Sequence, residues 1–163
     1  MSESQFYSRR GDDGYTGLLG PERVPKYDPR PEAYGAVDES QAAMGLARAS
    51  DCSARTGKML LDSQRELHTL MAELAALGAP DSPFTGGITT AQVEQLEAWI
   101  SEIEAGLQMP REFVVPGDSQ AGAALHLART IVRRAERVCV RLLHEGLLHN
   151  KQVVRYLNRL SSL

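Results

Sequence analysis

The sequence has no apolar run long enough to span a membrane, and its first residues lack the basic and apolar stretches of a secretory leader. The formal net charge is only −3, so overall charge gives no reason to expect nucleic acid or an anionic membrane as the partner. We therefore expect a cytoplasmic protein that binds neither nucleic acid nor membranes.

Cysteine and histidine are too few and too scattered to indicate a metal or redox centre. The two cysteines, Cys52 and Cys139, lack metal-binding or redox spacing and are most simply interpreted as buried thiols in a reducing compartment. The four histidines share no metal-ligand spacing either. No Ser/His/Asp or Cys/His arrangement can be identified, so the pattern gives little support to nucleophilic catalysis by the protein itself.

Helical periodicity is the dominant pattern in the sequence. Apolar residues recur every three or four positions in five segments, and these predict helices beginning near residues 31, 53, 89, 119 and 149. In the third segment Thr89 and Gln92 have capping-box spacing, and an apolar seam runs from Val93 to Leu107. No strand-like alternation is long enough to predict a sheet. The fold class is therefore all-α, with residues 1–163 forming a single domain and residues 32–163 a five-helix bundle.

Arginines gather on one face of the fourth predicted helix. Arg133, Arg137 and Arg141 are spaced four residues apart, with Glu136 beside them. Like charges at this spacing repel one another and weaken an isolated helix. Such a face either binds anionic groups, such as carboxylates or a phosphate chain, or is a solvated and salt-bridged surface, and the pattern leaves both interpretations open. Asp38, on the first predicted helix, is one candidate counter-ion.

Residues 1–31 are rich in Gly, Pro and Asp and lack sustained periodicity, which predicts an irregular segment. Glycines at positions 11, 14, 17 and 20 lie among hydroxyl and arginine side chains, and such a stretch can present backbone N–H groups closely to phosphate oxygens. It matches neither a Walker A loop nor a dinucleotide fingerprint. Phosphate binding and a flexible tail both stay open as interpretations.

A set of ordered motifs covers nearly the whole chain. The motifs are Tyr7–Gly20, Arg23–Lys26, Glu32–Glu39, Phe113–Gly117, Leu125–Thr130, Arg133–Arg137 and Tyr156–Ser161. This set resembles the PduO-type ATP:cob(I)alamin adenosyltransferases. The resemblance implies a five-helix bundle that forms a homotrimer with active sites between subunits. It also implies that the adenosyl group of ATP is transferred to reduced cobalamin, with Mg²⁺ present and triphosphate released, and that adenosylcobalamin can be delivered to a mutase or dehydratase.

The same resemblance implies roles for individual residues. Phe113 would crowd the lower face of the corrin ring, exclude the axial ligand and favour the four-coordinate Co(II) form that is easier to reduce; plain packing is the alternative role for this ring. Asp38 and Arg133 would form a salt bridge across the subunit boundary, and with Phe113 they make up the predicted catalytic set. The predicted ATP-binding residues are Ser8, Arg9, Arg10, Gly11, Thr16, Gly17 and Lys26 in the N-terminal segment, and Arg133, Glu136, Arg137 and Asn158 in the bundle.

Two other functions stay open at the level of sequence. One is a catalytically poor relative that binds ATP and corrinoid and stores or delivers adenosylcobalamin, and the other is a helical oligomerisation scaffold. A carrier has less need of a phosphate clamp such as Lys26 with Arg137, and a scaffold explains neither the glycines nor the arginine face. The family pattern continues past Leu163 for a further turn or more of apolar helix, so we expect a shortened last helix.

Overall fold

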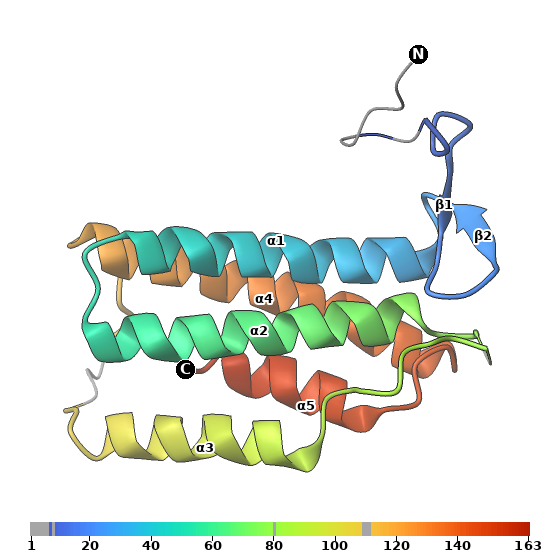
Figure 1. The fold of residues 1–163 in the computed structure, drawn as a ribbon. Helices are drawn as coiled ribbons and strands as arrows, with labels where there is room; N and C mark the ends of the chain where they lie inside the picture. The colour runs from blue at the N-terminus through green and yellow to red at the C-terminus, as the bar shows by residue number, and fades with distance from the viewer. Residues whose placement is uncertain (1–6, 8, 80, 109–111) are drawn as a thin grey trace.

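A computed structural model describes residues 7, 9–79, 81–108 and 112–163, and its main body is a bundle of helices (Figure 1). No helix in these ranges is long and apolar enough to cross a membrane. The predicted all-α fold with five helices is confirmed. The helices are α1 (Pro29–Ala49), α2 (Ala54–Ala75), α3 (Thr90–Glu104), α4 (Gln120–His144) and α5 (Lys151–Leu160).

Each helix is preceded by a residue whose side chain accepts a hydrogen bond from a backbone N–H of the first turn. The five capping residues are Asp28, Ser53, Thr89, Ser119 and Asn150. At Thr89 the reciprocal bond also forms, because its backbone N–H donates to the Gln92 side chain at 2.9 Å. The predicted capping box is thus confirmed, and local sequence determines where the helices begin.

The N-terminal segment differs from its prediction in two respects. Residues 15–25 form an antiparallel hairpin of β1 (Tyr15–Gly17) and β2 (Arg23–Pro25) instead of an irregular stretch. The sequence did not predict it, because strands of three residues are too short to show alternation. In addition, α1 begins at Pro29, two residues earlier than expected. Asp28 caps this start and proline suits the first helical position.

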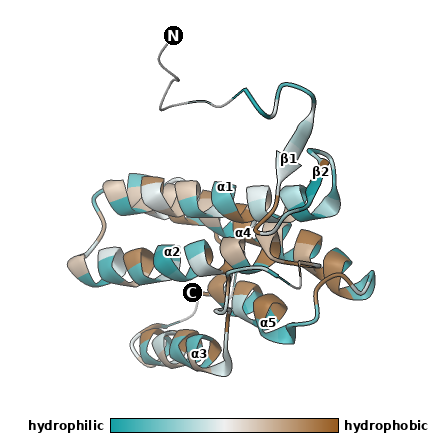
Figure 2. Ribbon diagram, turned by 45° about the vertical axis from the view of Figure 1, so that its right-hand side comes forward, coloured by the Kyte–Doolittle hydropathy of each residue, from teal (hydrophilic) through white to brown (hydrophobic). Residues whose placement is uncertain are grey.

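The most extensive contact between helices is made by α1 and α4. Both helices bury small side chains, with alanine at positions 33, 36, 43 and 47 of α1 and at 124, 128 and 135 of α4. Small side chains allow two helix axes to approach closely. The buried Ser40 donates its hydroxyl to the carbonyl of Ala36 at 2.9 Å and so needs no partner from another helix. Figure 2 shows the alternation of hydrophilic and hydrophobic faces around the helices that accompanies this packing.

Helix α3 is packed less completely than its apolar seam predicts. Val93 and Leu96 are buried, and α3 contacts α5. Farther along, Ile100 and Ile103 are only partly buried, and Leu107 lies beyond the helix end and is 57% exposed. Figure 1 shows α3 extending past the end of α5. The seam is therefore buried in the first half of α3, only partly buried at Ile100 and Ile103, and absent at Leu107.

The two cysteines lie in different environments. Cys139 is fully buried on α4, and burial raises the pKa of its thiol to about 12. Such a thiol is unreactive at neutral pH. Cys52 is only partly buried, in the connection between α1 and α2, so the prediction of a buried thiol is wrong at that position.

A carboxylate lies beside a buried phenol where α2 contacts α5. The hydroxyl of Tyr156 donates to Oε2 of Glu66 at 2.8 Å, and Tyr156 is fully buried. Partial burial raises the pKa of Glu66 above its ordinary value of 4.5; the hydrogen bond from Tyr156 opposes this shift and the charge of Asp62 adds to it. The charged form of Glu66 is therefore less compatible with the fold than the protonated form.

Glu66→Gln should raise the thermal midpoint by a few degrees at pH 7, because glutamine can still accept the Tyr156 hydrogen bond but carries no charge to desolvate. A pKa raised by folding means that the wild-type carboxyl stabilises the fold fully only below its unfolded pKa, near 4.5, and loses that contribution as the pH rises through the folded pKa. The advantage of glutamine should thus vanish in thermal melts below pH 4.5. An equal advantage at pH 4 and pH 7 would contradict this account, and exposed Glu94→Gln on α3 serves as the control.

Candidate functional site

Residues 9–14 form a tight loop in front of β1. The N–H of Asp12 donates to the carbonyl of Arg9, and the N–H of Gly14 donates to the carbonyl of Gly11, each at 3.2 Å. Arg9 has a φ of 58° and Gly14 a φ of 81°, in the left-handed region where glycine is favoured. These two hydrogen bonds give the loop a defined shape.

The side chain of Lys26 reaches this loop from the end of the hairpin. The backbone N–H of Lys26 donates to the carbonyl of Gly14 at 2.9 Å. A Cβ added at Gly11 would lie only 3.1 Å from Nζ of Lys26, so the ammonium group lies directly against the glycine. Thr16 and Gly17 belong to β1, opposite Val24 and Arg23 of β2. The hairpin therefore places the Lys26 ammonium against Gly11, two of the residues predicted to bind phosphate, and carries Thr16 and Gly17 on its first strand.

Arg23, on β2, forms hydrogen bonds with the same loop. Its guanidinium donates to both carboxylate oxygens of Asp13, at 3.0 and 2.9 Å, and also to the carbonyl of Arg10. The hydrogen bonds from Arg23 lower the pKa of the Asp13 carboxyl. Both side chains are about half exposed, so the pair adds little to stability and acts mainly on the shape of the loop. The sequence analysis missed this pair, because only the hairpin turn brings residues ten positions apart together.

The second group of predicted ATP ligands lies on α4 and α5. Nδ2 of Asn158 donates to Oε1 of Glu136 at 2.9 Å, which joins the two helices. Oδ1 of Asn158 accepts a hydrogen bond from Arg159 at 2.7 Å. Arg133 and Arg137 are exposed on α4, on either side of Glu136 in the sequence. The structure thus places a bonded Glu–Asn pair beside two exposed guanidinium groups.

The arginine face of α4 is only partly neutralised within the chain. Arg141 pairs with Glu145, four residues later, at 2.7 Å. In contrast, Arg133 and Arg137 take part in none of the ion pairs found within the described ranges. The interpretation as a salt-bridged surface therefore describes Arg141, and the other two guanidinium groups are available to bind an anion.

Asp38 is exposed on α1, and no ion pair of the described chain includes it. Its neighbour Glu39 pairs with Arg134, the neighbour of Arg133 on α4. Within one chain, the residues next to the predicted pair therefore form a bridge from α1 to α4. Asp38 and Arg133 themselves do not pair with each other.

Phe113 lies on the connection between α3 and α4, and its ring is completely exposed, at 104% relative accessibility. Val114 and Val115, the next two residues, are 57% and 80% exposed. Packing inside the single chain therefore does not account for this aromatic residue. Three consecutive exposed apolar side chains make this connection a candidate for contact with another molecule.

The structure does not join the two groups of predicted ATP ligands within one chain. Between residues 11–26 and the α4 and α5 ligands, all of which are described, no hydrogen bond or ion pair forms. Ser8 lies outside the described residues. Arg9 and Arg10 are exposed at the start of the loop, and the guanidinium of Arg9 lies over the ring of Tyr7, 5.4 Å from its centroid. The described part of the chain holds no cluster of three or more His, Cys, Asp or Glu residues suited to a metal ion.

Comparison with curated proteins finds related enzymes. The chain is 39% identical over 157 residues to the corrinoid adenosyltransferase PduO of Salmonella typhimurium, which covers 96% of this chain and 46% of that protein. It is 39% identical over 166 residues to the corrinoid adenosyltransferase of Mycobacterium tuberculosis, which covers 98% of this chain and 84% of that protein. The chain therefore spans less than half of the Salmonella relative but most of the mycobacterial one.

Solved structures and a family model agree with these relatives. A variant of a PduO-type ATP:corrinoid adenosyltransferase from Lactobacillus reuteri, complexed with cobalamin and ATP, has a TM-score of 0.85 and 32% identity, covering 97% of this chain and 88% of that one. A second variant of that enzyme, complexed with ATP, has a TM-score of 0.83 and 32% identity, covering 96% and 87%. Residues 6–163 match the family model described as cobalamin adenosyltransferase. The resemblance found in the motifs is confirmed, and this chain belongs to the cobalamin adenosyltransferase family.

Proposed function

We propose that this protein transfers the 5′-deoxyadenosyl group of ATP to the cobalt of cob(I)alamin, giving adenosylcobalamin and triphosphate. The observation that carries the proposal is that Arg133 and Arg137, which form no ion pair with the described residues, lie on α4 beside the bonded Glu136–Asn158 pair. It is supported by family membership and by the relative that was solved with cobalamin and ATP.

The proposed reaction needs position and charge stabilisation more than acid–base chemistry. An electron pair of Co(I) forms a bond to the 5′ carbon of ATP, the bond from that carbon to the triphosphate oxygen breaks, and the triphosphate leaves with the bonding electrons. Cobalt is thereby oxidised formally from +1 to +3. No proton has to be removed, so the protein's task is to align the two substrates and to stabilise the leaving anion.

The phosphates of ATP would lie against the N-terminal loop. Lys26 and the backbone N–H groups around Gly11 offer positive charge at close range, and Thr16 adds a hydroxyl. Ser8, Arg9, Arg10 and Gly17 belong to the same predicted set. Arg133 and Arg137 would neutralise the charge that develops on the triphosphate, with Glu136 and Asn158 orienting the nucleotide beside them.

Mg²⁺ would enter as the cation bound to ATP. Magnesium usually keeps several water ligands and binds through substrate phosphates with one or two carboxylates. The absence of a cluster of three metal-binding side chains among the described residues fits such a site. Phosphate oxygens would therefore supply most of the ligands that are not water.

A homotrimer with active sites between subunits would unite the two groups of ATP ligands. In one chain these groups are not bonded to each other, and Asp38 and Arg133 have no ion-pair partner among the described residues. A bridge from Asp38 of one subunit to Arg133 of the next would satisfy both charges. Removing either residue would leave the other uncompensated in the interface, which costs more than the pair contributes.

Phe113 would act on the corrinoid. Its exposed ring can cover the lower face of the corrin and exclude an axial ligand, and the four-coordinate Co(II) form is easier to reduce. An apolar ring suits this role because it occupies the space without offering a lone pair to cobalt. Adenosylcobalamin could then pass to a mutase or dehydratase that requires it.

Purified protein mixed anaerobically with ATP, Mg²⁺ and chemically reduced cob(I)alamin should form adenosylcobalamin over many turnovers, followed in the visible spectrum. Lys26→Ala and Arg133→Ala should each lower kcat/KM for ATP by roughly a hundredfold, because each removes a charge that stabilises the leaving group. The thermal midpoint of Lys26→Ala should stay near wild type, since that side chain is exposed. Arg133→Ala should also lower the midpoint, because it leaves Asp38 without its partner in the proposed trimer. Exposed Arg65→Ala on α2 is the control. Binding of ATP and corrinoid without turnover would instead indicate a carrier. A protein that binds neither ATP nor corrinoid would be a scaffold.

Mixing two inactive variants tests whether sites form between subunits. Lys26→Ala damages the loop and Arg137→Ala damages the α4 surface, so neither homo-oligomer should be active. If each site combines the loop of one subunit with α4 of another, an equal mixture of randomly exchanged subunits should regain about a quarter of the wild-type sites. A mixture that regains no activity after demonstrated subunit exchange would place each site within a single subunit.

Phe113→Ala should impair the reaction that starts from Co(II) with a reductant far more than transfer from chemically prepared cob(I)alamin. The alanine leaves space for an axial ligand, and this disfavours reduction without changing the alkyl transfer itself. Parallel assays from the two oxidation states measure the difference. Equal loss in both would contradict the assigned role, and Leu107→Ala, another exposed apolar side chain, should affect neither.

A further inference from the structure

The hairpin that carries the N-terminal loop is attached to the bundle at the end of α2. The N–H of Leu19 donates to the carbonyl of Ala75 at 2.8 Å, and Leu18 is buried. A Cβ added at Gly20 would lie only 2.7 Å from Cβ of Ala79, so the hairpin turn lies directly against the chain that leaves α2. The orientation of the loop therefore depends on this contact.

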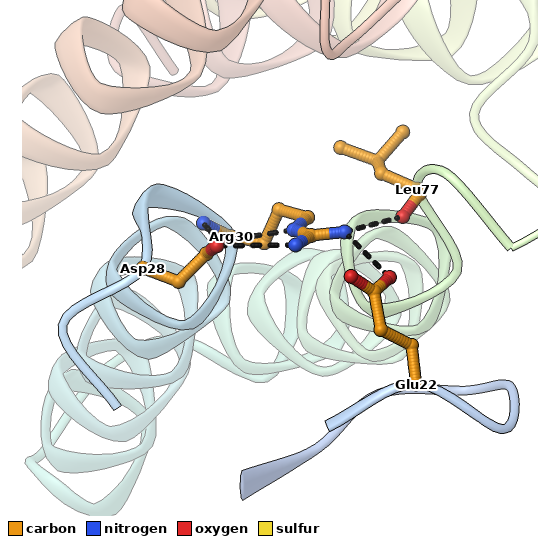
Figure 3. A network of polar contacts seen from close by, with 4 residues as sticks. All are labelled: Glu22, Asp28, Arg30 and Leu77. Atoms are coloured by element: carbon orange, nitrogen blue, oxygen red, sulfur yellow. Dashed lines mark hydrogen bonds and ion pairs between the residues drawn. The ribbon is translucent and has the colours of Figure 1, made fainter. Parts of the chain in front are cut away.

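Arg30, the second residue of α1, lies within this contact and joins three segments (Figure 3). Its Nε and Nη2 donate to Oδ1 and Oδ2 of Asp28 at 2.9 and 3.1 Å. Its Nη1 donates to Oε2 of Glu22 at 3.1 Å and to the carbonyl of Leu77 at 3.3 Å. One planar group thus connects the start of α1, the hairpin turn and the chain just past α2.

The surroundings of Arg30 are specific for a guanidinium group. Its side chain is only 12% exposed, and a Cβ added at Gly78, whose φ is 76°, would lie 3.3 Å from Nη1. Hydrogen bonding to Arg30 lowers the pKa of the Asp28 carboxyl. The guanidinium donates to Asp28 with two nitrogens and to Glu22 and Leu77 with the third. A lysine ammonium is a point charge on a flexible chain and cannot reproduce this arrangement.

We propose that Arg30 is a positioning residue for ATP, which it does not itself contact: it sets the angle of the hairpin on α2, and thereby the placement of Lys26 and Gly11 against the phosphates. The inference rests on the function proposed above, because it assumes that the loop binds the phosphates of ATP. Arg30 belongs to none of the sets of predicted ligands, and its link to the loop runs through Glu22 and the hairpin turn.

Arg30→Lys should raise KM for ATP by roughly ten- to a hundredfold, because a displaced Lys26 and Gly11 would make weaker charge-assisted hydrogen bonds to the phosphates. KM for cob(I)alamin and the thermal midpoint should stay close to wild type, because the bundle core is untouched. Arg55→Lys, which alters the exposed 2.6 Å pair of Arg55 with Glu102, is the matched control and should leave both KM values unchanged. A purely structural role would lower the thermal midpoint without separating the two KM values.

Two further measurements report the link independently of turnover. Hydrogen exchange at the Leu19 amide, which is bonded to Ala75, should be faster in Arg30→Lys than in wild type, whereas amides in the middle of α4 should be unaffected. Glu22→Gln should raise KM for ATP in the same direction but less. The double variant should raise KM for ATP little beyond the value for Arg30→Lys alone, since both substitutions break the same bond between Arg30 and Glu22.

The outcomes separate this inference from the proposed function. Unchanged KM for ATP with unchanged Leu19 exchange in Arg30→Lys would overturn the inference while leaving the transferase intact. If wild type forms no adenosylcobalamin, the proposed function fails, and calorimetric titration with ATP then decides: weaker binding by Arg30→Lys supports the positioning role, whereas equal binding or no binding by wild type overturns it.

Discussion

Close packing of α1 on α4 is the constraint on which the helical part of the candidate site depends. Ala36, Ser40 and Ala135 are buried, and their small size lets the two helices approach. Because successive helical residues point in different directions, burying these positions turns Asp38 and Arg133 outward. The packing of the core thereby leaves one acidic and one basic group of adjacent helices exposed at the surface.

The other part of the site is built on a hairpin that is too small to be stable alone. Two strands of three residues need support from the rest of the protein, and two arginines provide it at different levels. Arg23 ties the loop to β2 through Asp13, and Arg30 ties the hairpin turn to both α1 and α2. The proposed reaction depends on alignment, so the residues that support the N-terminal loop matter as much as those proposed to bind phosphate.

Helix starts and candidate ligands could be predicted from the sequence because both depend on short-range patterns. Thr89 and Gln92 lie three residues apart, and their capping box forms as predicted. Lys26, Arg133 and Phe113 were selected as site residues from the order of short motifs in the chain. Those motifs correctly identified the family, although the roles of the individual residues stay predictions.

The amino-acid sequence by itself determined the five helices, their starts to within about two residues, and the family. Only the tertiary structure decided which charges are neutralised, since Arg141 pairs with Glu145 while Arg133 pairs with none of the described residues. It also decided that residues 15–25 form a hairpin and that Arg30 anchors it. The physical reason is separation along the sequence. Caps and periodicity depend on residues a few positions apart, whereas these contacts join segments that only folding brings together.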